Sequence, residues 1–143
     1  MDFRPIALIV DDEPEILATI QRRLRIDEIQ SEITDNPTIA IDMMKQRMFP
    51  IVVCDVRMPE MSGVDLIGKL REVNPLCNVI MITAYSSIDS VITCLNHGAV
   101  DYFVKPFQNI DWIVQAVAEA KQRVDRWGQT LPIASEGVKQ EAT

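Results

Sequence analysis

Short apolar runs alternate with longer segments of helical period along this chain. The runs are rich in β-branched or aromatic residues, and acidic residues, proline or glycine bound them, which is typical of strands. Four of the five show no alternation of apolar and polar positions, so we expect both faces of these strands to be buried. That is the property of a parallel sheet covered by helices on both sides. The predicted strands are residues 6–10, 31–34, 51–54, 79–82 and 102–104.

Amphipathic helices are predicted between the runs. Pro14 suits the first turn of the first helix, which carries one apolar stripe. The fourth helix carries a stripe of the same kind and ends near Gly98, a natural left-handed cap. These elements predict an α/β fold, an open (βα)5 doubly wound sheet with five parallel strands. The predicted helices are residues 14–25, 37–48, 62–73, 86–96 and 109 to about 126.

Length and composition indicate a single domain. The chain has 143 residues, of which 48% are hydrophobic and 24% charged, and this length leaves little room for a second core. The apolar period is lost after Trp127. We therefore expect a folded domain over residues 1–127 and a flexible tail over residues 128–143.

Charge and cysteine content narrow the class of protein. Asp and Glu total 21 and Lys and Arg 14, so the formal net charge is -7. This charge opposes binding to a phosphate backbone, and we expect no direct nucleic-acid partner. Cys54, Cys77 and Cys94 stand in apolar stretches without CxxC spacing, which favours free thiols in a reducing cytoplasm. No segment predicts a membrane anchor.

Polar residues follow four of the predicted strands, at the sheet edge where ligands bind in this architecture. At an effective dielectric near 20, two carboxylates ~4 Å apart repel by roughly 4 kcal/mol, so converging acids need a cation. An all-oxygen acidic cluster suits Mg2+. A hydroxyl and an ammonium are suitable partners for phosphoryl oxygens. The residues are Asp11, Asp12 and Glu13, then Asp55, then Thr83, then Lys105.

These residues resemble those of the receiver domain of two-component response regulators. The resemblance covers residue 6 to about residue 124, and it implies the flavodoxin-like strand order 2-1-3-4-5. Four motifs carry it. They are Val10-Asp11-Asp12-Glu13-Pro14, residues 55–63 (DVRMPEMSG), Thr83-Ala84 and Lys105-Pro106-Phe107.

The resemblance implies a role for each acid. Asp55 is the expected phosphoacceptor, whose carboxylate attacks a phosphohistidine on a sensor histidine kinase or a phosphotransfer protein. Asp12, Asp55 and the backbone carbonyl of Arg57 are expected to hold Mg2+ directly. Asp11 is expected to act mainly through a bound water.

The remaining motif residues are implied to handle the phosphoryl group and the switch. Lys105 and Thr83 would each contact a phosphoryl oxygen, and the Lys105–Pro106 bond is expected to be cis. Tyr102 occupies the position of an aromatic switch residue that turns inward when Thr83 moves toward Asp55. A static strand aromatic is the alternative for Tyr102.

Two partner surfaces are expected. A kinase would dock on the first helix, through Glu15, Ala18, Thr19 and Arg22, together with an exposed Phe107; a solvated helix face is the alternative. A downstream protein would bind the surface of the fourth helix, fifth strand and fifth helix. That surface includes Trp112, whose alternative role is partial surface packing.

Two side chains are expected to influence the lifetime of the phosphorylated state. Arg57 and Tyr85 stand two residues after Asp55 and Thr83, at positions that flank the phosphoryl group in the family. Their bulk should hinder an in-line water. Alternatively, Arg57 pairs with a neighbouring acid.

Competing functions remain. A haloacid-dehalogenase-like phosphatase also uses an aspartyl phosphate with Mg2+, but Asp55 lacks that family's DxD pair. A flavodoxin-type cofactor binder would need a hydroxyl- and glycine-rich loop where residues 11–14 read DDEP. The chain could also be the receiver piece of a longer transcription regulator. We expect a signalling switch with no enzymatic activity beyond its own phosphorylation and dephosphorylation.

Overall fold

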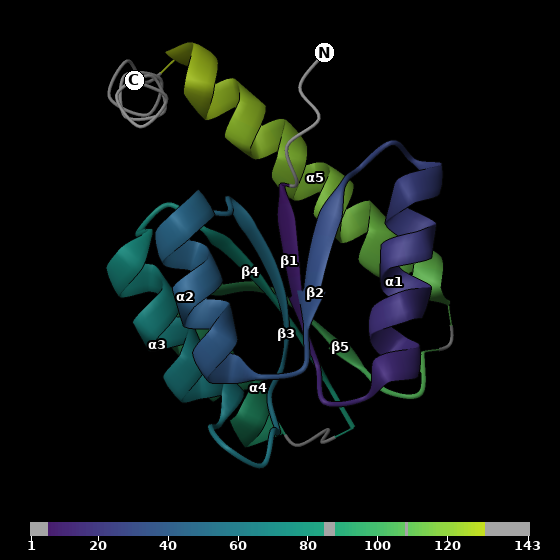
Figure 1. Ribbon diagram of the computed structural model, residues 1–143, viewed down its shortest axis with the longest axis vertical. Helices are drawn as coiled ribbons and strands as arrows, with labels where there is room; N and C mark the ends of the chain where they lie inside the picture. The colour runs from purple at the N-terminus through teal and green to yellow at the C-terminus, as the bar shows by residue number, and fades with distance from the viewer. Residues whose placement is uncertain (1–5, 85–87, 108, 131–143) are drawn as a thin grey trace.

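Five parallel strands form the sheet in the part of the chain that the computed structural model describes, residues 6–84, 88–107 and 109–130. Their order is β2-β1-β3-β4-β5, as the resemblance implies. Figure 1 shows the sheet between two layers of helices, with α1 and α5 on one face and α2, α3 and α4 on the other. The strands are β1 (Ala7–Val10), β2 (Ser31–Thr34), β3 (Ile51–Asp55), β4 (Asn78–Thr83) and β5 (Ala99–Val104).

The helices follow the strands in strict alternation, and proline or a capping side chain begins several of them. Asn36 accepts from the backbone N–H of Thr38 at 2.9 Å, and Pro37 fills the first helical position that follows. The Ser62 hydroxyl oxygen accepts from the N–H of Asp65 at 3.1 Å. The helices are α1 (Pro14–Ile26), α2 (Pro37–Arg47), α3 (Gly63–Val73), α4 (Ile88–Asn96) and α5 (Ile110–Thr130).

The central strands face a hydrophobic cluster on each side of the sheet. Leu8 and Val10 belong to the cluster under α2 and α3, whereas Ala7 and Ile9 belong to the cluster under α1 and α5. Every residue of β1, β3 and β4 is buried, which explains their lack of alternation. The prediction is wrong for β5, where Val100 is 44% exposed, because this strand lies at an edge of the sheet.

The helix α4 departs from the predicted pattern. Its apolar stripe largely faces outward, and Ile88, Ile92 and Leu95 are 76%, 51% and 47% exposed. Only Cys94 of this helix is fully buried. After α4 the backbone of Gly98 has φ 103°, as expected for its cap.

The end of α5 corrects the predicted tail. The helix continues to Thr130, so residues 128–130 are helical, and residues 131–143 lie outside the described part of the chain. No helix within the described residues is long and apolar enough to cross a membrane. The three cysteines are buried and free, as expected.

The start of α3 is pressed against the end of β3. A Cβ atom on Gly63 would lie 2.3 Å from the carbonyl oxygen of Asp55 and 2.6 Å from the Cα of Val56. Only glycine fits this approach without moving the backbone. The close contact fixes the loop that carries Arg57 beside the end of the sheet, where the candidate site lies.

Candidate functional site

The acidic residues meet because β1 and β3 are neighbours in register. Val10 pairs with Cys54, so Asp11 and Asp55 leave adjacent strands at the same level. Asp11 is fully buried, Asp55 is 4% exposed, and Asp12 faces solvent. One carboxylate oxygen from each of the three acids lies within 4.8 Å of the others.

Backbone donors orient the two buried carboxylates. The N–H of Glu13 donates to Asp11 Oδ1 at 2.8 Å, and the N–H of Arg57 donates to Asp55 Oδ1 at 3.0 Å. Each donor lies two residues after its acid, so the loop that follows the strand holds the carboxylate in place. The second oxygen of each acid is left to face Lys105.

Lys105 lies at the centre of the site. Its Nζ lies 2.7 Å from Asp11 Oδ2, 2.8 Å from Glu13 Oε2 and 3.1 Å from Asp55 Oδ2. Its backbone N–H donates to the carbonyl of Thr83 at 2.7 Å, and the following peptide bond to Pro106 is cis, as the resemblance implies. One ammonium therefore faces three carboxylates.

Burial and neighbouring charges have opposing effects on the pKa values of Asp11, Asp55 and Lys105. Burial raises the pKa of Asp11 to about 6 despite the nearby Lys105 and the Glu13 N–H, and burial likewise raises the pKa of Asp55. Burial alone would lower the pKa of Lys105, but the surrounding carboxylates of Asp11, Glu13 and Asp55 raise it. Burial thus disfavours the charged form of both acids, whereas the carboxylates around Lys105 favour its charged form.

Thr83 and Tyr102 lie on the strands beside the acids. Asp55 pairs with Ile82 in the register of β3 and β4, so the buried Thr83 ends the strand next to the acid. Tyr102 pairs with Met81 and is half-buried against the cluster under α2 and α3. An inward turn of Tyr102 when Thr83 moves toward Asp55 stays a prediction.

The acidic cluster fits a divalent cation. Its ligands are oxygens alone, the donor set that Mg2+ prefers. Asp11 Oδ2 is buried and, although Lys105 Nζ is near, accepts no hydrogen bond of normal geometry among the described residues. Beside the cluster lies an open hollow of about 400 Å³ lined by Asp12, Val56, Arg57, Met58, Pro59 and Ser62.

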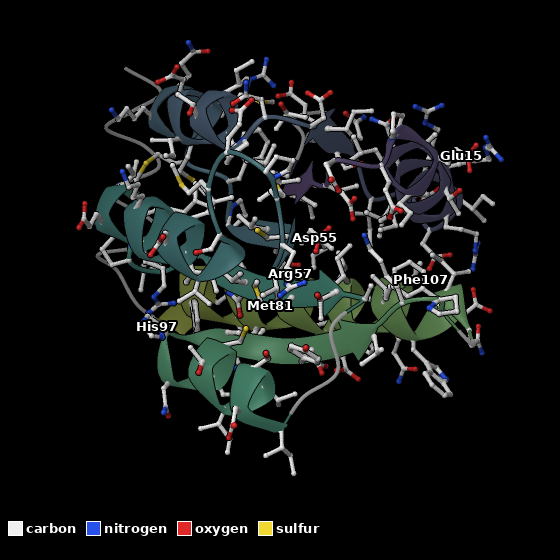
Figure 2. All side chains as sticks on the ribbon, turned by 90° about the horizontal axis from the view of Figure 1, so that it is seen from below. Glu15, Asp55, Arg57, Met81, His97 and Phe107 are labelled. Carbon is white, nitrogen blue, oxygen red and sulfur yellow. The ribbon has the colours of Figure 1, made fainter. Side chains whose placement is uncertain are left out.

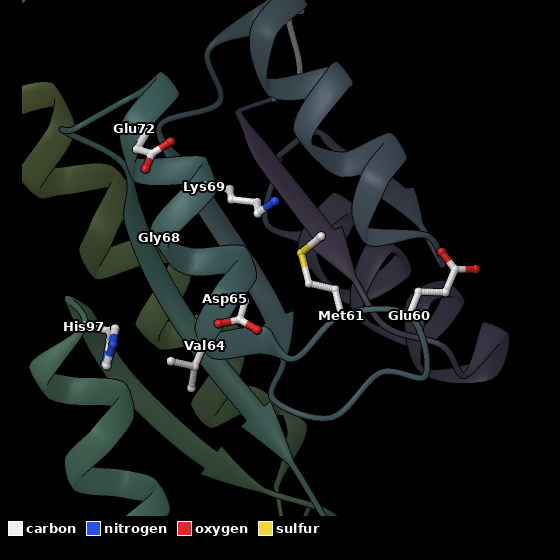
Figure 3. A pocket seen from close by; sticks show the side chains of 8 residues that line it. All are labelled: Glu60, Met61, Val64, Asp65, Gly68, Lys69, Glu72 and His97. Atoms are coloured by element: carbon white, nitrogen blue, oxygen red, sulfur yellow. The ribbon is translucent and has the colours of Figure 1, made fainter.

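A second groove lies along α3, away from the three acids. It has a volume of about 390 Å³, and Figure 3 shows His97 at one end and Glu60 at the other. The sole histidine of the sequence, His97, lies at the end of α4, and its Nδ1–H donates to the carbonyl oxygen of Thr93 at 2.8 Å. We assign no chemistry to this groove.

The expected partner residues lie at the surface, with one exception. Glu15, Ala18 and Arg22 are exposed on α1, and Trp112 is 51% exposed on α5. Phe107, expected to be exposed, is half-buried against the cluster under α1 and α5. Figure 2 shows Glu15 and Phe107 on the same side of the molecule, opposite His97.

Sequence reasoning missed one contact, and one of its predictions concerns a residue outside the described part of the chain. It placed Glu13 beside the acidic pair without a role, whereas the structure brings its carboxylate to Lys105. The length of this side chain was the available signal. Tyr85 lies outside the described residues, and Arg57, with its side chain exposed, is near Asp55 in Figure 2.

Comparisons with known proteins agree with this geometry. The family model for the response regulator receiver domain matches residues 7–118. The chain belongs to this family, and its strand order and acidic site are those of a receiver domain. The phosphatase and flavodoxin alternatives are therefore set aside.

Individual relatives are also response regulators or receiver domains. The chain is 33% identical over 113 residues to the transcriptional regulatory protein ZraR of Klebsiella oxytoca, covering 79% of this chain and 25% of ZraR. A CheY-like receiver domain protein from Methanospirillum hungatei is similar in structure, with a TM-score of 0.77, 26% identity and coverage of 84% and 96% of the two chains. The beryllofluoride-activated NtrC4 receiver domain dimer has a TM-score of 0.77, 28% identity and coverage of 82% and 96%. The chain thus spans about a quarter of the length of ZraR.

Proposed function

We propose that this receiver domain accepts a phosphoryl group on Asp55 from a phosphohistidine of a sensor histidine kinase or phosphotransfer protein. The observation that carries the proposal is the buried Asp55 carboxylate, whose Oδ2 lies 3.1 Å from Lys105 Nζ at the acidic end of the sheet. A phosphoryl group bonded to Asp55 would find the ammonium within reach of its oxygens.

The proposed transfer makes one bond and breaks one. A carboxylate oxygen of Asp55 bonds to phosphorus while the phosphorus–nitrogen bond of the donor breaks, and the electron pair returns to the imidazole, which takes a proton from solvent. Lys105 and the hydroxyl of Thr83 donate to the phosphoryl oxygens. The backbone N–H of Arg57 holds the attacking carboxylate through Oδ1.

Mg2+ is the proposed cofactor. Asp12, Asp55 and the carbonyl of Arg57 would hold it, with Asp11 acting through a water. When bound, the ion offsets the charge of the acids and supplies a Lewis acid to the phosphoryl oxygens. This requirement follows from the clustered carboxylates, which repel a dianionic group.

Two surfaces are proposed for protein partners. The exposed Glu15, Ala18 and Arg22 of α1, with Phe107 at its edge, would contact the kinase. The exposed apolar side chains of α4, together with Val104 and Trp112, would contact a downstream protein. Thr83 and Tyr102 would couple this second surface to phosphorylation.

Whether the receiver acts alone or within a longer protein is also a matter for proposal. A folded receiver whose last helix, α5, continues to Thr130 would act as a signalling switch in the cytoplasm, without a separate enzymatic activity. Since the chain spans a quarter of ZraR, a receiver within a longer transcription regulator is the second setting. In either setting the receiver itself would not contact nucleic acid, given its net charge of -7.

Mass spectrometry tests the proposal directly. Incubation with a small phosphodonor and Mg2+ should add one acid- and base-labile phosphoryl group, which Asp55→Asn or a chelator abolishes. Asp65→Asn, an exposed acid on α3, is the matched control and should label as the wild type does. Full labelling of Asp55→Asn would overturn the assignment.

A second experiment tests the switch. A partner protein should bind the beryllofluoride–Mg2+ form about 5–150-fold more tightly than the unmodified form, and should itself favour phosphorylation, because coupling is reciprocal. Thr83→Ala should still accept a phosphoryl group yet lose most of this preference. If Thr83→Ala keeps the full preference, the route through Thr83 and Tyr102 is wrong even with Asp55 confirmed.

A further inference from the structure

The ammonium of Lys105 has as many carboxylate neighbours as it has protons to donate. An ammonium carries three N–H donors, and three carboxylates lie within 3.1 Å of Nζ. These neighbours are Asp11, Glu13 and Asp55. A phosphoryl oxygen therefore competes with these carboxylates for a place beside Nζ.

Burial decides which carboxylate leaves most readily. The side chain of Asp11 is fully buried and that of Asp55 is 6% exposed, so neither can be rehydrated where it stands. The side chain of Glu13 is 57% exposed. Water can therefore replace Lys105 as its partner at little cost.

The position of Glu13 on the chain leaves its carboxylate available for this contact. It stands at the N-cap of α1, yet its side chain makes no capping hydrogen bond. Its structural contribution is made by the backbone, whose N–H donates to Asp11 Oδ1. Replacing the carboxylate leaves that backbone bond intact.

We propose, on the basis of the proposed phosphoacceptor function, that Glu13 is a positioning residue whose carboxylate occupies the anion position of Lys105 until a phosphoryl group displaces it. Its Oε2 atom stands where a phosphoryl oxygen would accept from Nζ. Glu13 thus competes with the phosphoryl group and with anionic phosphodonors for the same ammonium. It raises the threshold for activation without taking part in bond formation.

The test measures affinity for beryllofluoride, a stand-in for the phosphoryl group on an aspartate. In Glu13→Gln the affinity in Mg2+ should rise about fivefold, the factor that corresponds to losing one exposed ion pair. The KM for an anionic small phosphodonor should fall by a similar factor, with kcat unchanged. Glu60→Gln is the control, since Glu60 is exposed and forms no ion pair with another of the described residues.

Glu13→Asp separates contact from charge. It keeps the negative charge but shortens the side chain by one methylene, so the contact with Lys105 is lost. We expect Glu13→Asp to bind beryllofluoride as Glu13→Gln does. The side-chain ¹⁵N resonance of Lys105, assigned with Lys105→Met, should shift in both variants before beryllofluoride is added and coincide with the wild type afterwards.

The outcomes distinguish this inference from the proposed function. If the wild type is phosphorylated on Asp55 but Glu13→Gln behaves like Glu60→Gln, the role of Glu13 is refuted and the phosphoacceptor stands. Wild-type affinity in Glu13→Asp would show that long-range charge acts rather than the contact, which also overturns the proposal. Labelling that persists in Asp55→Asn would remove the basis of both.

Discussion

The two ends of the sheet both bury polar side chains, but they satisfy them differently. At the amino end, Asn74 donates through Nδ2 to the Phe49 carbonyl at 3.0 Å and accepts from the Leu76 N–H at 3.2 Å. Asn78 there accepts from Arg123 at 3.2 Å. At the carboxyl end, the buried groups are acids that share a single ammonium.

The buried amides at the amino end stabilise the fold, whereas the buried acids at the carboxyl end form the candidate site. A neutral amide has both donors and acceptors, so backbone groups can satisfy it without net charge. Clustered carboxylates have only acceptors and repel one another, which costs stability until a cation arrives. The carboxyl end is therefore the part of the domain where clustered charge lowers stability until a cation binds.

The largest expected effect comes from placing an acid at the amino end. Asn74→Asp removes the donor to the Phe49 carbonyl and sets a buried carboxylate against it. The free energy of unfolding should fall by about 3 kcal/mol at neutral pH, measured by urea denaturation. The loss should shrink at low pH, where a protonated acid can donate. An unchanged midpoint would show that the amino end tolerates charge as the carboxyl end does.

An effect of comparable size is expected at Asp11, in the pH dependence of the free energy of unfolding without metal. The pKa of Asp11 is about 6 in the folded protein against the ordinary 3.8, so the folded state binds more protons between these values. Its contribution to stability is therefore lost as pH rises from about 4 through 6. In chelator, the unfolding free energy of Asp11→Asn relative to the wild type should rise over this range by up to about 3 kcal/mol. A constant difference would show that the carboxyl is already ionised at pH 4.

A smaller effect, of opposite sign to Asn74→Asp, is expected at Asp55. Asp55→Asn replaces a carboxylate by an amide, the reverse of Asn74→Asp, and so removes one negative charge from the acidic cluster. Without metal it should raise the unfolding free energy by about 1 kcal/mol, or the melting temperature by about 2–4 °C. Asp12→Ala should act in the same direction, and both should weaken Mg2+ binding. Lower melting temperatures in both variants would show that these acids are structural.

The sequence predicts the carboxyl end better than it predicts the surface. Apolar runs locate the strands, and the residue after each run must lie at the same edge of a parallel sheet, so Asp11, Asp55 and Lys105 could be placed together. The strand order came from the resemblance and is confirmed. Composition and period alone do not fix that order, and the edge position of β5 follows from it.

Two features depend on tertiary contacts that a local pattern does not contain. The stripe of α4 has the period of a buried face, but the helix lies against the edge strand and leaves Ile88 and Ile92 exposed. The reach of Glu13 to Lys105 joins residues 92 positions apart and depends on how α1 sits over the site. Neither can be deduced from spacing along the chain.

The smallest expected effect concerns the lifetime of the phosphorylated state. Arg57 follows Asp55 by two residues, its backbone N–H donates to Asp55 Oδ1, and it lines the hollow beside the acidic cluster. With Tyr85, it should hinder a water that approaches in line. Arg57→Ala combined with Tyr85→Ala should speed dephosphorylation about fivefold, which is a barrier change of about 1 kcal/mol. The loss of label is followed after the donor is removed, with each single variant as a control. An unchanged rate in the double variant would mean that charge at the carboxyl end, rather than bulk at its mouth, governs hydrolysis.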